Sequence, residues 1–399
     1  MTQSPPEKQE LPEGRITEEA MDKLRALVGV HLRTERFLRA VTTESMGLFA
    51  KGIGDLNPLF CDEEYAKWTR WGGIIGHPCL PYARHYPGRT RFGLPGVHGF
   101  FGGNDWTFHR TVKPGDTLSC TEQVTSVEEK ESRLSGRLVL TRTVTCYYNQ
   151  RDELVAEAEG WSTRHERRAS REGARKPKGD DSGRGRHDYT TEDLDLIEAT
   201  ARKEWQDLTA GRTLYYEDLT PGTEIPAIVR GPLTAMDITA YLIGVGRSRG
   251  AHGVMLRESD KHPAHFFRNR AAGGGLEYTG AGHVQASVAK QVGAPGSYDY
   301  GPQRISWLAS LLTNWIGDLG RLVRLRAELR GFNVIGDTTW LKGRVVGTRV
   351  ENDQHLVDCE VWGENQLGAT TMPGLATVAL PSRSPVKPKA ASLENGHGG

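Results

Sequence analysis

Asp55, Asn57 and Pro58 are the first residues whose types and spacing could do chemistry. They lie in residues 54–60, read GDLNPLF, directly after the apolar run MGLFAKGI. Pro58 disfavours helical geometry at Asn57, so a helix is expected to end here and to present the Asp55 carboxylate at the break. Such a carboxylate can transfer protons, but an Asx turn at a helix end would use the same residues structurally. Both interpretations stay open from this segment alone.

The composition restricts the class of protein. The chain has 399 residues, which is long for one domain and comfortable for two. Its 51 Lys and Arg against 50 Asp and Glu give no overall field that would favour nucleic acid or an anionic membrane. The five scattered cysteines have no CxxC or Cys/His ligand spacing. With no apolar run near the roughly 20 residues of a membrane helix, a cytoplasmic protein with neither membrane nor nucleic-acid partner is predicted.

Periodicity divides the chain into helical and strand-rich segments. Helices are expected at about 16–30 and 43–53, and the Gly- and Pro-rich residues 72–105 are expected to be loops. From Trp106 the apolar period changes to two, which predicts a meander of antiparallel strands. The predicted division is a disordered N-terminus (1–14), a first domain (15–163), a charged linker (164–188), a second domain (189–381) and a disordered tail (382–399).

An internal repeat relates the two predicted domains. VKPGDTLSCTEQVTSV matches VIGDTTWLKGRVVGTRV and places Asp116 opposite Asp337. TVTCYYNQRDELVAEAEG matches LVDCEVWGENQLGATTMPG and pairs Gln150 with Gln366, while TTESMGLFAKGIG matches LTAMDITAYLIGVG. The three matches keep one order and a nearly constant offset, so two copies of a helix-then-sheet unit are predicted. Each copy is expected to bury its own core and to pack beside the other.

A helix ending in G-D-x-N-P, followed by a strand meander that contains PGDTL, resembles the MaoC-like (R)-specific enoyl-CoA hydratases and dehydratases. The first half is similar to the fatty-acid-synthase-type dehydratase domain of that family. The resemblance covers nearly the whole chain and implies an α+β double hotdog, in which two repeats each wrap a curved antiparallel sheet around a central helix. It also implies an acyl-CoA thioester as substrate and no cofactor beyond the CoA of that substrate.

The family motif D-x-N-P-x-H is incomplete in this chain. In the family an Asp and a His of this motif hold a water molecule and move protons. Asp55 and Asn57 match, so the resemblance implies a catalytic Asp55 and a substrate contact for Asn57. Phe60 stands where the family has His, and phenylalanine cannot transfer a proton.

His252 and His283 are the candidates for the missing histidine. Counted from the helix end in the second half, Arg247 falls opposite Asp55 and His252 falls at the histidine position. Counted from the downstream side, GHVQASVAKQVG matches FCDEEYAKWTRWGG and puts His283 opposite Phe60. We favour His283 because a helix-like segment follows it as in the family, and His252 stays the alternative. The two counts differ because residues 248–277 form an insertion.

The resemblance also assigns the residues around the long apolar segment SYDYGPQRISWLASLLTNWIGDLG. In the family a glycine at the entry of this helix supplies an oxyanion donor, so Gly301 inherits that role, and a helix N-terminus is suited to it. Tyr298 and Tyr300 flank Gly301 and, with Arg247, are predicted to contact substrate. Glu277 is a further candidate for the missing acid.

The remaining histidines carry weaker predictions. Residues 248–277 are rich in His and Arg but lack HExxH or an equivalent ligand spacing, so no metal is predicted. Their cationic side chains would line a route for CoA phosphates or form a solvated surface loop. His77 and His98 are expected to be local hydrogen-bonding residues.

The predicted function is hydration or dehydration of a trans-2-enoyl-CoA in fatty-acid, branched-acid or steroid side-chain metabolism. The broken motif keeps open a catalytically inactive acyl-CoA-binding subunit, alone or as the partner of a heteromeric hydratase. A thioesterase or another hotdog lyase is a third alternative. A homodimer or a heteromer with another hotdog subunit is expected.

Overall fold

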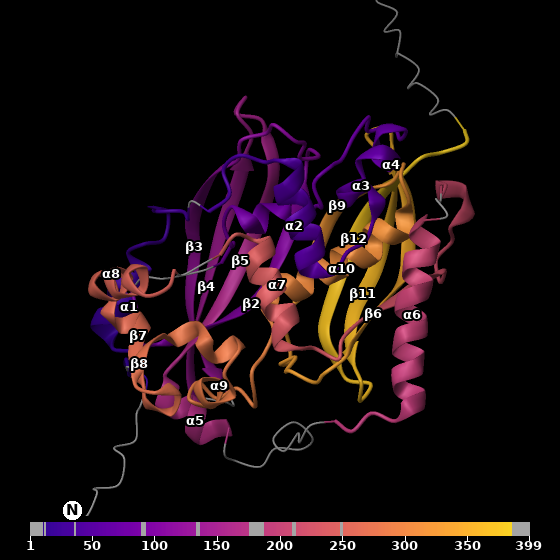
Figure 1. The fold of residues 1–399 in the computed structure, drawn as a ribbon. Helices are drawn as coiled ribbons and strands as arrows, with labels where there is room; N and C mark the ends of the chain where they lie inside the picture. The colour runs from indigo at the N-terminus through magenta and orange to yellow at the C-terminus, as the bar shows by residue number, and fades with distance from the viewer. Residues whose placement is uncertain are drawn as a thin grey trace, which may run out of the picture.

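The computed structural model describes residues 11–384 except 12, 36, 89–92, 133–135, 175–186, 210–212 and 248–249. Its main feature is a ten-stranded antiparallel sheet in the order β1-β3-β4-β5-β2-β9-β12-β11-β10-β6, to which each half of the chain gives five strands (Figure 1). The strands are β1 His31–Leu32, β2 His98–Phe108, β3 Ser119–Ser132, β4 Gly136–Tyr148, β5 Leu154–His165, β6 Glu224–Arg230, β9 Arg321–Glu328, β10 Thr339–Glu351, β11 Gln354–Asn365 and β12 Thr370–Leu380.

The helices lie mainly against one side of this sheet and at its ends (Figure 1). They are α1 Glu18–Arg25, α2 Thr43–Ile53, α3 Pro58–Cys61, α4 Glu63–Lys67, α5 Arg167–Ala174, α6 Thr191–Thr209, α7 Ala235–Gly244, α8 Gly253–Lys261, α9 Ala286–Lys290 and α10 Gly301–Ile316. Short 3-10 turns are η1 Leu80–Ala83, η2 Tyr216–Asp218, η3 Pro263–His265, η4 Arg270–Ala272 and η5 Thr279–His283. Within the predicted insertion, β7 Phe266–Asn269 pairs with β8 Gly275–Tyr278.

The repeat found in the sequence recurs in the hydrogen bonds. In the first half, Gln150 Oε1 accepts from the Thr117 N–H at 2.9 Å, and its Nε2 donates to Asp116 Oδ1 at 3.2 Å. In the second half, Gln366 makes the same two bonds to the matching Gly-Asp-Thr turn, at 3.1 and 2.6 Å. The double hotdog fold predicted from the sequence is confirmed.

The two halves share one core, so the expectation of a separate core in each half was wrong. β2 and β9 pair from Gly103↔Glu328 to Thr107↔Arg324, which joins the two sheets into one. The largest hydrophobic cluster therefore contains residues of both halves, including Trp106 of β2 and Leu325 of β9. The physical reason is that pairing these two strands makes the apolar faces of the half-sheets continuous.

The central helix of the hotdog is complete only in the second half. There α10 runs for 16 residues, almost all of them buried. At the corresponding place the first half has only the four-residue turn η1, in a segment interrupted by Pro81, Pro87 and several glycines. Proline removes the backbone donor that a helix needs, which explains the difference. The predicted loop 72–105 is also shorter than expected, because β2 begins at His98 instead of Trp106.

The predicted disordered and linker segments are partly ordered. Leu11 is 1% exposed, and its N–H donates to Gln291 Oε1 at 3.0 Å. β5 and α5 occupy the start of the predicted linker, because the buried residues Arg164 and Arg167 anchor it. In the predicted tail, Arg383 forms an ion pair with Asp218. These parts of the predictions are corrected; the remainder of each segment lies outside the described residues.

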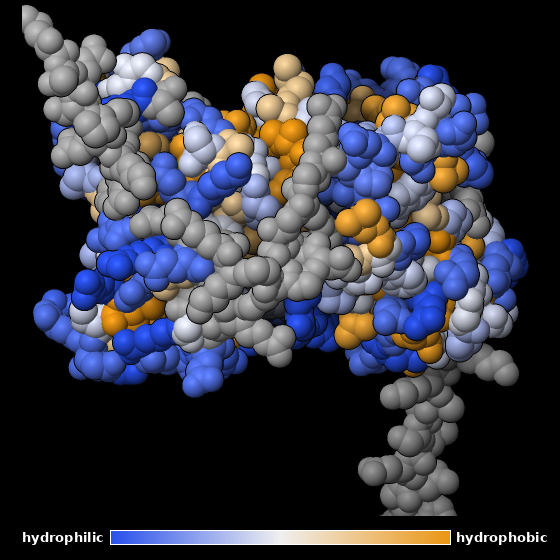
Figure 2. All heavy atoms as spheres, turned by 90° about the horizontal axis from the view of Figure 1, so that it is seen from below, coloured by the Kyte–Doolittle hydropathy of each residue, from blue (hydrophilic) through white to orange (hydrophobic). Residues whose placement is uncertain are grey.

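The described surface is largely polar. Seen from below, hydrophilic side chains cover most of the visible face, with apolar side chains in smaller groups between them (Figure 2). No helix in the described part of the chain combines the length and apolarity needed to cross a bilayer.

Candidate active site

Asp55 and Asn57 form a tight turn after α2. Gly54 ends the helix in the left-handed conformation, with φ of 71°. The Asp55 carboxylate then accepts the Asn57 N–H at 2.8 Å, and Asn57 Oδ1 accepts the Leu59 N–H at 3.0 Å. This geometry confirms the Asx-turn interpretation of the segment.

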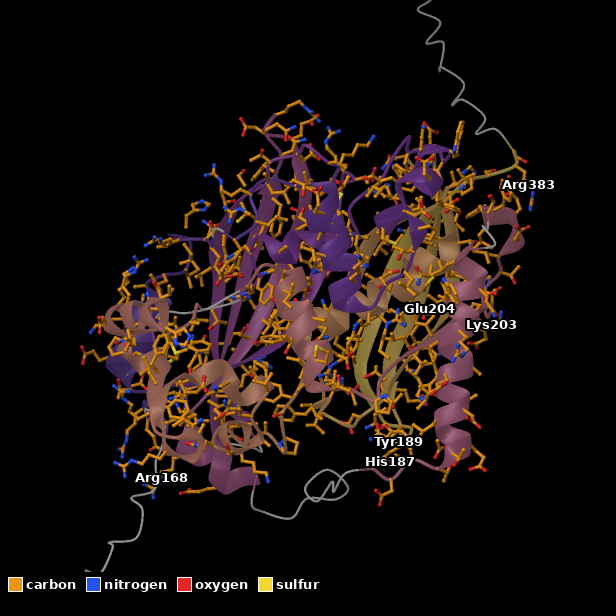
Figure 3. The ribbon with its side chains drawn as sticks, in the orientation of Figure 1. Arg168, His187, Tyr189, Lys203, Glu204 and Arg383 are labelled. Atoms are coloured by element: carbon orange, nitrogen blue, oxygen red, sulfur yellow. The ribbon has the colours of Figure 1, made fainter. Side chains whose placement is uncertain are left out.

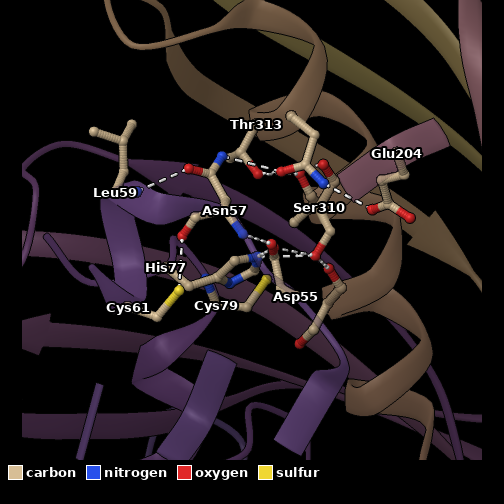
Figure 4. Close-up of polar contacts among 12 residues, drawn as sticks. Asp55, Asn57, Leu59, Cys61, His77, Cys79, Glu204, Ser310 and Thr313 are labelled. Carbon is tan, nitrogen blue, oxygen red and sulfur yellow. Dashed lines mark hydrogen bonds and ion pairs between the residues drawn. The ribbon is translucent and has the colours of Figure 1, made fainter. Parts of the chain in front are cut away.

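The second Asp55 oxygen faces the other half of the molecule. Ser310 of α10 donates its hydroxyl to Asp55 Oδ2 at 2.7 Å, and His77 Nε2 lies 3.7 Å from the same oxygen (Figure 4). Burial raises the pKa of Asp55, while the bonds from Ser310 and from the Asn57 N–H oppose that rise. Two halves of the chain therefore build one buried polar cluster.

His77 lies where its protonation state can be assigned from its contacts. Its Nδ1 accepts the Cys79 N–H at 3.1 Å, so the ring proton is on Nε2, which faces Asp55 and Ser310. Burial lowers the pKa of His77 to about 3, so the ring is neutral at ordinary pH. The ring of Phe60 packs edge-on against it, with centroids 5.2 Å apart. An imidazole thus lies beside the position where the motif expects one, but its Nε2–H is a donor and not a base.

Asn57 joins a chain of hydrogen bonds between elements and does not line either of the cavities described below. Its Nδ2 donates to Asn314 Oδ1 at 3.0 Å, and Asn314 donates to Glu204 at 2.9 Å. Glu204 and Arg230 then form an ion pair at 2.7 Å. Glu204 lies on the inner side of α6, whereas Lys203 points outward (Figure 3). These contacts give Asn57 a structural role in the described molecule.

The cavity next to the Asp55 cluster is small. Its volume is about 60 Å³, and His77, Phe60 and Thr313 are among its lining residues. A cavity needs roughly 10–15 Å³ to hold one water molecule, so this one has room for a few waters. An acyl thioester needs much more space.

The second cavity is large and lies at the opposite end of α10. Its volume is about 1430 Å³. The lining comes from the start of β2, the end of β5, α7, the insertion, η5 and the N-terminus of α10. Ser310, which contacts Asp55, lies nine residues after Gly301 on α10, so the two sites are about 13 Å apart along the helix axis.

His283 lines the large cavity and is held in one tautomer. Its Nδ1 lies 2.9 Å from the Tyr298 carbonyl oxygen. Because a carbonyl oxygen can only accept a hydrogen bond, Nδ1 carries the ring proton and donates it. The lone pair is therefore on Nε2. Its ring stacks on Tyr300 with centroids 3.7 Å apart. Burial lowers the pKa of His283 to about 4, and Arg247 adds to that lowering, so the ring is a neutral base at pH 7.

Gly301 lies at the wall of the same cavity as the first residue of α10. Its N–H has no acceptor within the helix, because the first turn of a helix leaves its donors unpaired. The adjacent Asp299 and Arg304 form a buried ion pair with two hydrogen bonds, at 2.6 and 2.7 Å. This pair ties the chain that enters α10 to the first turn of the helix.

Arg247 occupies the position after α7 that Asp55 occupies after α2. Each of the two reaches across to the other half: Asp55 to Ser310, and Arg247 to the ring of Tyr86, 3.8 Å from its centroid. Arg247 also pairs with Glu35 at 2.8 Å. The count from the helix end therefore places Arg247 correctly opposite Asp55. At this position the second half has a cation where the first half has an acid.

The described lining of the large cavity contains two carboxylates, Glu277 and Asp299. Asp299 is committed to Arg304, whereas Glu277 Oε2 accepts a hydrogen bond from Gln285 at 2.8 Å. Glu277 is therefore the carboxylate of this lining that remains for a role in the reaction.

The structure brings most of the predicted second-half residues together. His283, Tyr298, Tyr300, Gly301 and Arg247 all line the large cavity. His252 is exposed before α8 and lines neither cavity, and Asp55 belongs to the separate buried cluster. Sequence reasoning missed Tyr86, Arg164 and Arg167, which also line this cavity. They lie far along the chain from the second-half candidates, and no motif in the sequence connects them with those residues.

Comparison with known proteins agrees with this fold. The model of the FAS1-like dehydratase domain region matches residues 26–158. A probable enoyl-CoA hydratase alpha subunit of Thermomonospora curvata is 27% identical over 126 residues, which cover 27% of this chain and 40% of the relative. The chain thus matches well under half of the length of that relative.

Solved structures are similar over most of the chain. A MaoC-like dehydratase aligns with a TM-score of 0.57 at 16% identity, covering 90% of this chain and 99% of the other. A putative MaoC domain protein dehydratase of Chloroflexus aurantiacus gives 0.54 at 13%, covering 90% and 96%. A Mycobacterium tuberculosis protein described as a double hotdog gives 0.54 at 12%, covering 88% and 96%. The predicted resemblance is therefore confirmed: the chain is similar in fold to MaoC-like dehydratases over most of its length, and residues 26–158 match the FAS1-like dehydratase domain region.

Proposed function

We propose that the protein is an enoyl-CoA hydratase or dehydratase whose chemistry takes place in the large cavity. The observation that carries this proposal is the neutral His283, with its Nε2 lone pair, in the same cavity as the N-terminus of α10. The volume of about 1430 Å³ accommodates an acyl thioester, whereas the cavity of about 60 Å³ beside Asp55 does not. The proposed reaction needs no cofactor beyond the CoA of the substrate.

In the proposed hydration, the water oxygen bonds to Cβ of the enoyl group while His283 Nε2 takes a water proton. The double-bond electrons move toward the thioester oxygen, where the Gly301 N–H stabilises the developing negative charge. The Nε2–H of the protonated His283 then gives this proton to Cα, which restores the neutral ring. The Glu277 carboxylate of the same cavity stabilises the transient positive charge of the ring. Dehydration follows the same steps in reverse.

The test is an absorbance assay of purified protein with crotonyl-CoA and a bulkier enoyl-CoA. His283→Gln is expected to lower kcat by about 10²–10⁴, the usual contribution of a positioned acid or base. His252→Gln is the matched comparison, because the other repeat count makes His252 the site histidine. If the His252→Gln protein loses turnover while the His283→Gln protein stays active, the proposal is contradicted.

Glu277→Gln keeps the shape of the side chain and its bond with Gln285 but removes the negative charge. We expect a kcat decrease of at least about tenfold with little change in KM, since the proposed role lies in the transition state. Wild-type protein that binds acyl-CoA without any turnover would instead support the inactive acyl-CoA-binding subunit.

We further propose that the protein works in the cytoplasm as a dimer or with a second hotdog subunit. The support is that the T. curvata relative is named an alpha subunit. Light scattering checks this assembly. It measures the mass of the protein purified alone and of the protein purified after co-expression with a second hotdog protein. A monomer that hydrates enoyl-CoA at full rate would contradict it.

A further inference from the structure

We propose that the acyl group of the substrate carries a second anionic group, a carboxylate, which binds Arg164 and Arg167 in the large cavity. This inference rests on the proposed function, because it specifies the substrate class of the same site. Both residues line the cavity and are only 4% and 3% exposed. Two buried guanidinium groups on one wall create a region of positive potential, which favours an anionic part of the ligand.

Arg164 is held at this wall by its neighbours. It lies at the end of β5, opposite Gly99 of β2. A Cβ at Gly99 would lie 3.2 Å from Arg164 Cδ, so glycine at that position leaves the space that the arginine side chain occupies. Arg164 Nη2 donates to the Leu94 carbonyl oxygen at 3.1 Å. The guanidinium group is therefore positioned before any ligand arrives.

Arg167 follows three residues later as the first residue of α5. The two arginines lie close enough for their charges to interact: burial lowers the pKa of Arg164 to about 10, and the charge of Arg167 adds to this lowering. Like charges packed together favour the binding of an anion between or beside them.

His98 completes the subsite. It lines the cavity, and its buried Nε2 has no hydrogen-bond partner among the residues that the structure describes. Burial, together with the charges of Arg167 and other nearby groups, holds the pKa of His98 well below its ordinary value. The neutral imidazole can therefore donate one hydrogen bond to a carboxylate without adding a further charge.

A wall of aromatic rings connects this subsite with the reacting groups. Ring centroids lie 4.5 Å apart for His283 and Tyr298, 6.3 Å for Tyr298 and Phe100, and 4.5 Å for Phe100 and His98. These rings form a continuous path from the proposed base to the subsite. An acyl group that extends along this path from His283 would direct a terminal carboxylate toward His98 and the two arginines.

Three other arginines of the described lining each have an acidic partner: Arg304 pairs with Asp299, Arg330 with Glu328, and Arg247 with Glu35 at the end of α7. We assign the recognition of a charged acyl group to Arg164 and Arg167, because both are buried in the cavity wall together with the His98 Nε2, which lacks a hydrogen-bond partner in the described part of the chain.

The test compares crotonyl-CoA with trans-4-carboxybut-2-enoyl-CoA, an enoyl thioester with a terminal carboxylate. Wild-type protein is expected to prefer the carboxylated substrate. Arg167→Gln should lower its kcat/KM by about 10- to 100-fold and change that of crotonyl-CoA less than about threefold, the range of one hydrogen bond to a charged group. Arg167→Lys should restore part of the loss. Arg168→Gln is the matched control, because Arg168 lies on the same helix but points to solvent (Figure 3).

Binding of unreactive analogues separates this inference from the proposed reaction. Calorimetry with glutaryl-CoA and butyryl-CoA should show a preference for glutaryl-CoA that Arg167→Gln removes, even if no enoyl-CoA is turned over. Equal weakening of both analogues would overturn the inference. Arg167→Gln could instead weaken the binding of both CoA thioesters and leave the binding of the matching pantetheine thioesters unchanged. That result would also overturn the inference and assign the arginines to a CoA phosphate. Thermal melts of each variant check that the fold is retained.

Discussion

At the scale of single residues, the environment of His283 sets the pH dependence of the proposed reaction. The folded pKa of about 4 lies below the ordinary value of 6.5, because burial disfavours the charged ring. The base form is therefore present above about pH 4 and is lost as the pH falls through that value. We expect the acidic limb of kcat/KM against pH to have its midpoint near 4. A midpoint near 6.5 would show that the essential base is a solvated histidine instead.

Asp55 tests whether the motif that carries the family resemblance also takes part in the chemistry. Asp55→Asn keeps an acceptor for the Asn57 N–H, and Ser310 can still donate to the Ser306 carbonyl oxygen, 3.2 Å away. Because burial raises the pKa of Asp55, the charged form is disfavoured in the fold, and Asp55→Asn is expected to be as stable as wild type or more so at pH 7. Asp55→Ala leaves buried donors unpaired and should cost about 1–3 kcal/mol.

Urea unfolding measures both Asp55 variants, and the enoyl-CoA assay measures their activity. Turnover within about threefold of wild type is expected for Asp55→Asn, since the residue lies outside the large cavity. If the Asp55→Asn protein is well folded but inactive, the reaction takes place at the Asp55 cluster and not in the large cavity.

At the scale of elements, α2 and α7 cross at two glycines. A Cβ at Gly52 would lie 2.8 Å from the Ala240 carbonyl oxygen, and one at Gly244 would lie 2.7 Å from the Leu48 carbonyl oxygen. Gly52→Ala should therefore destabilise the protein by about 1–3 kcal/mol, because the backbones must separate. Gly47→Ala on the same helix is the control: its Cβ meets nothing within 4 Å, so it should stabilise by about 0.5–1 kcal/mol. Equal midpoints in urea for the two variants would contradict this packing.

The N-terminus of α10 is the element that carries the proposed oxyanion donor. Gly301→Pro removes the N–H, and proline is tolerated at the first position of a helix. Gly301→Ala keeps the N–H and introduces the same contact with Leu329 and Phe101, whose nearest atoms would lie 2.5 Å from the new Cβ. Relative to Gly301→Ala, the proline variant should lose a further 10²–10³ in kcat, about the cost of one oxyanion donor. Equal rates for the two would assign the donor to another group.

At the scale of the whole molecule, the continuous sheet and the shared core predict cooperative unfolding. β2 and β9 pair across the boundary between the halves, and the main hydrophobic cluster includes both. We expect one thermal transition, with coincident circular dichroism and fluorescence midpoints and equal calorimetric and van't Hoff enthalpies. Residues 1–188 expressed alone should aggregate or remain partly unfolded, because β2 would be an exposed edge. Two separate transitions would indicate independent cores.

The sequence by itself determined the fold resemblance, the repeat and the order of the elements. These are local properties: the GDLNP turn, the PGDTL turn and the period-two strands are specified by neighbouring residues. The same local patterns made Gly301 and His283 candidates, because each lies next to a recognisable helical segment. The absent histidine at Phe60 was also readable directly.

Only the tertiary structure decided which residues meet. Asp55 contacts Ser310, 255 residues later, and Arg164 reaches the cavity wall that His283 lines. No local pattern encodes such contacts, because they depend on the pairing of β2 with β9 and on the course of α10 between the halves. His252 and His283 differ for the same reason. Both fit a count along the chain, but of the two it is His283 that lines the large cavity in the folded structure.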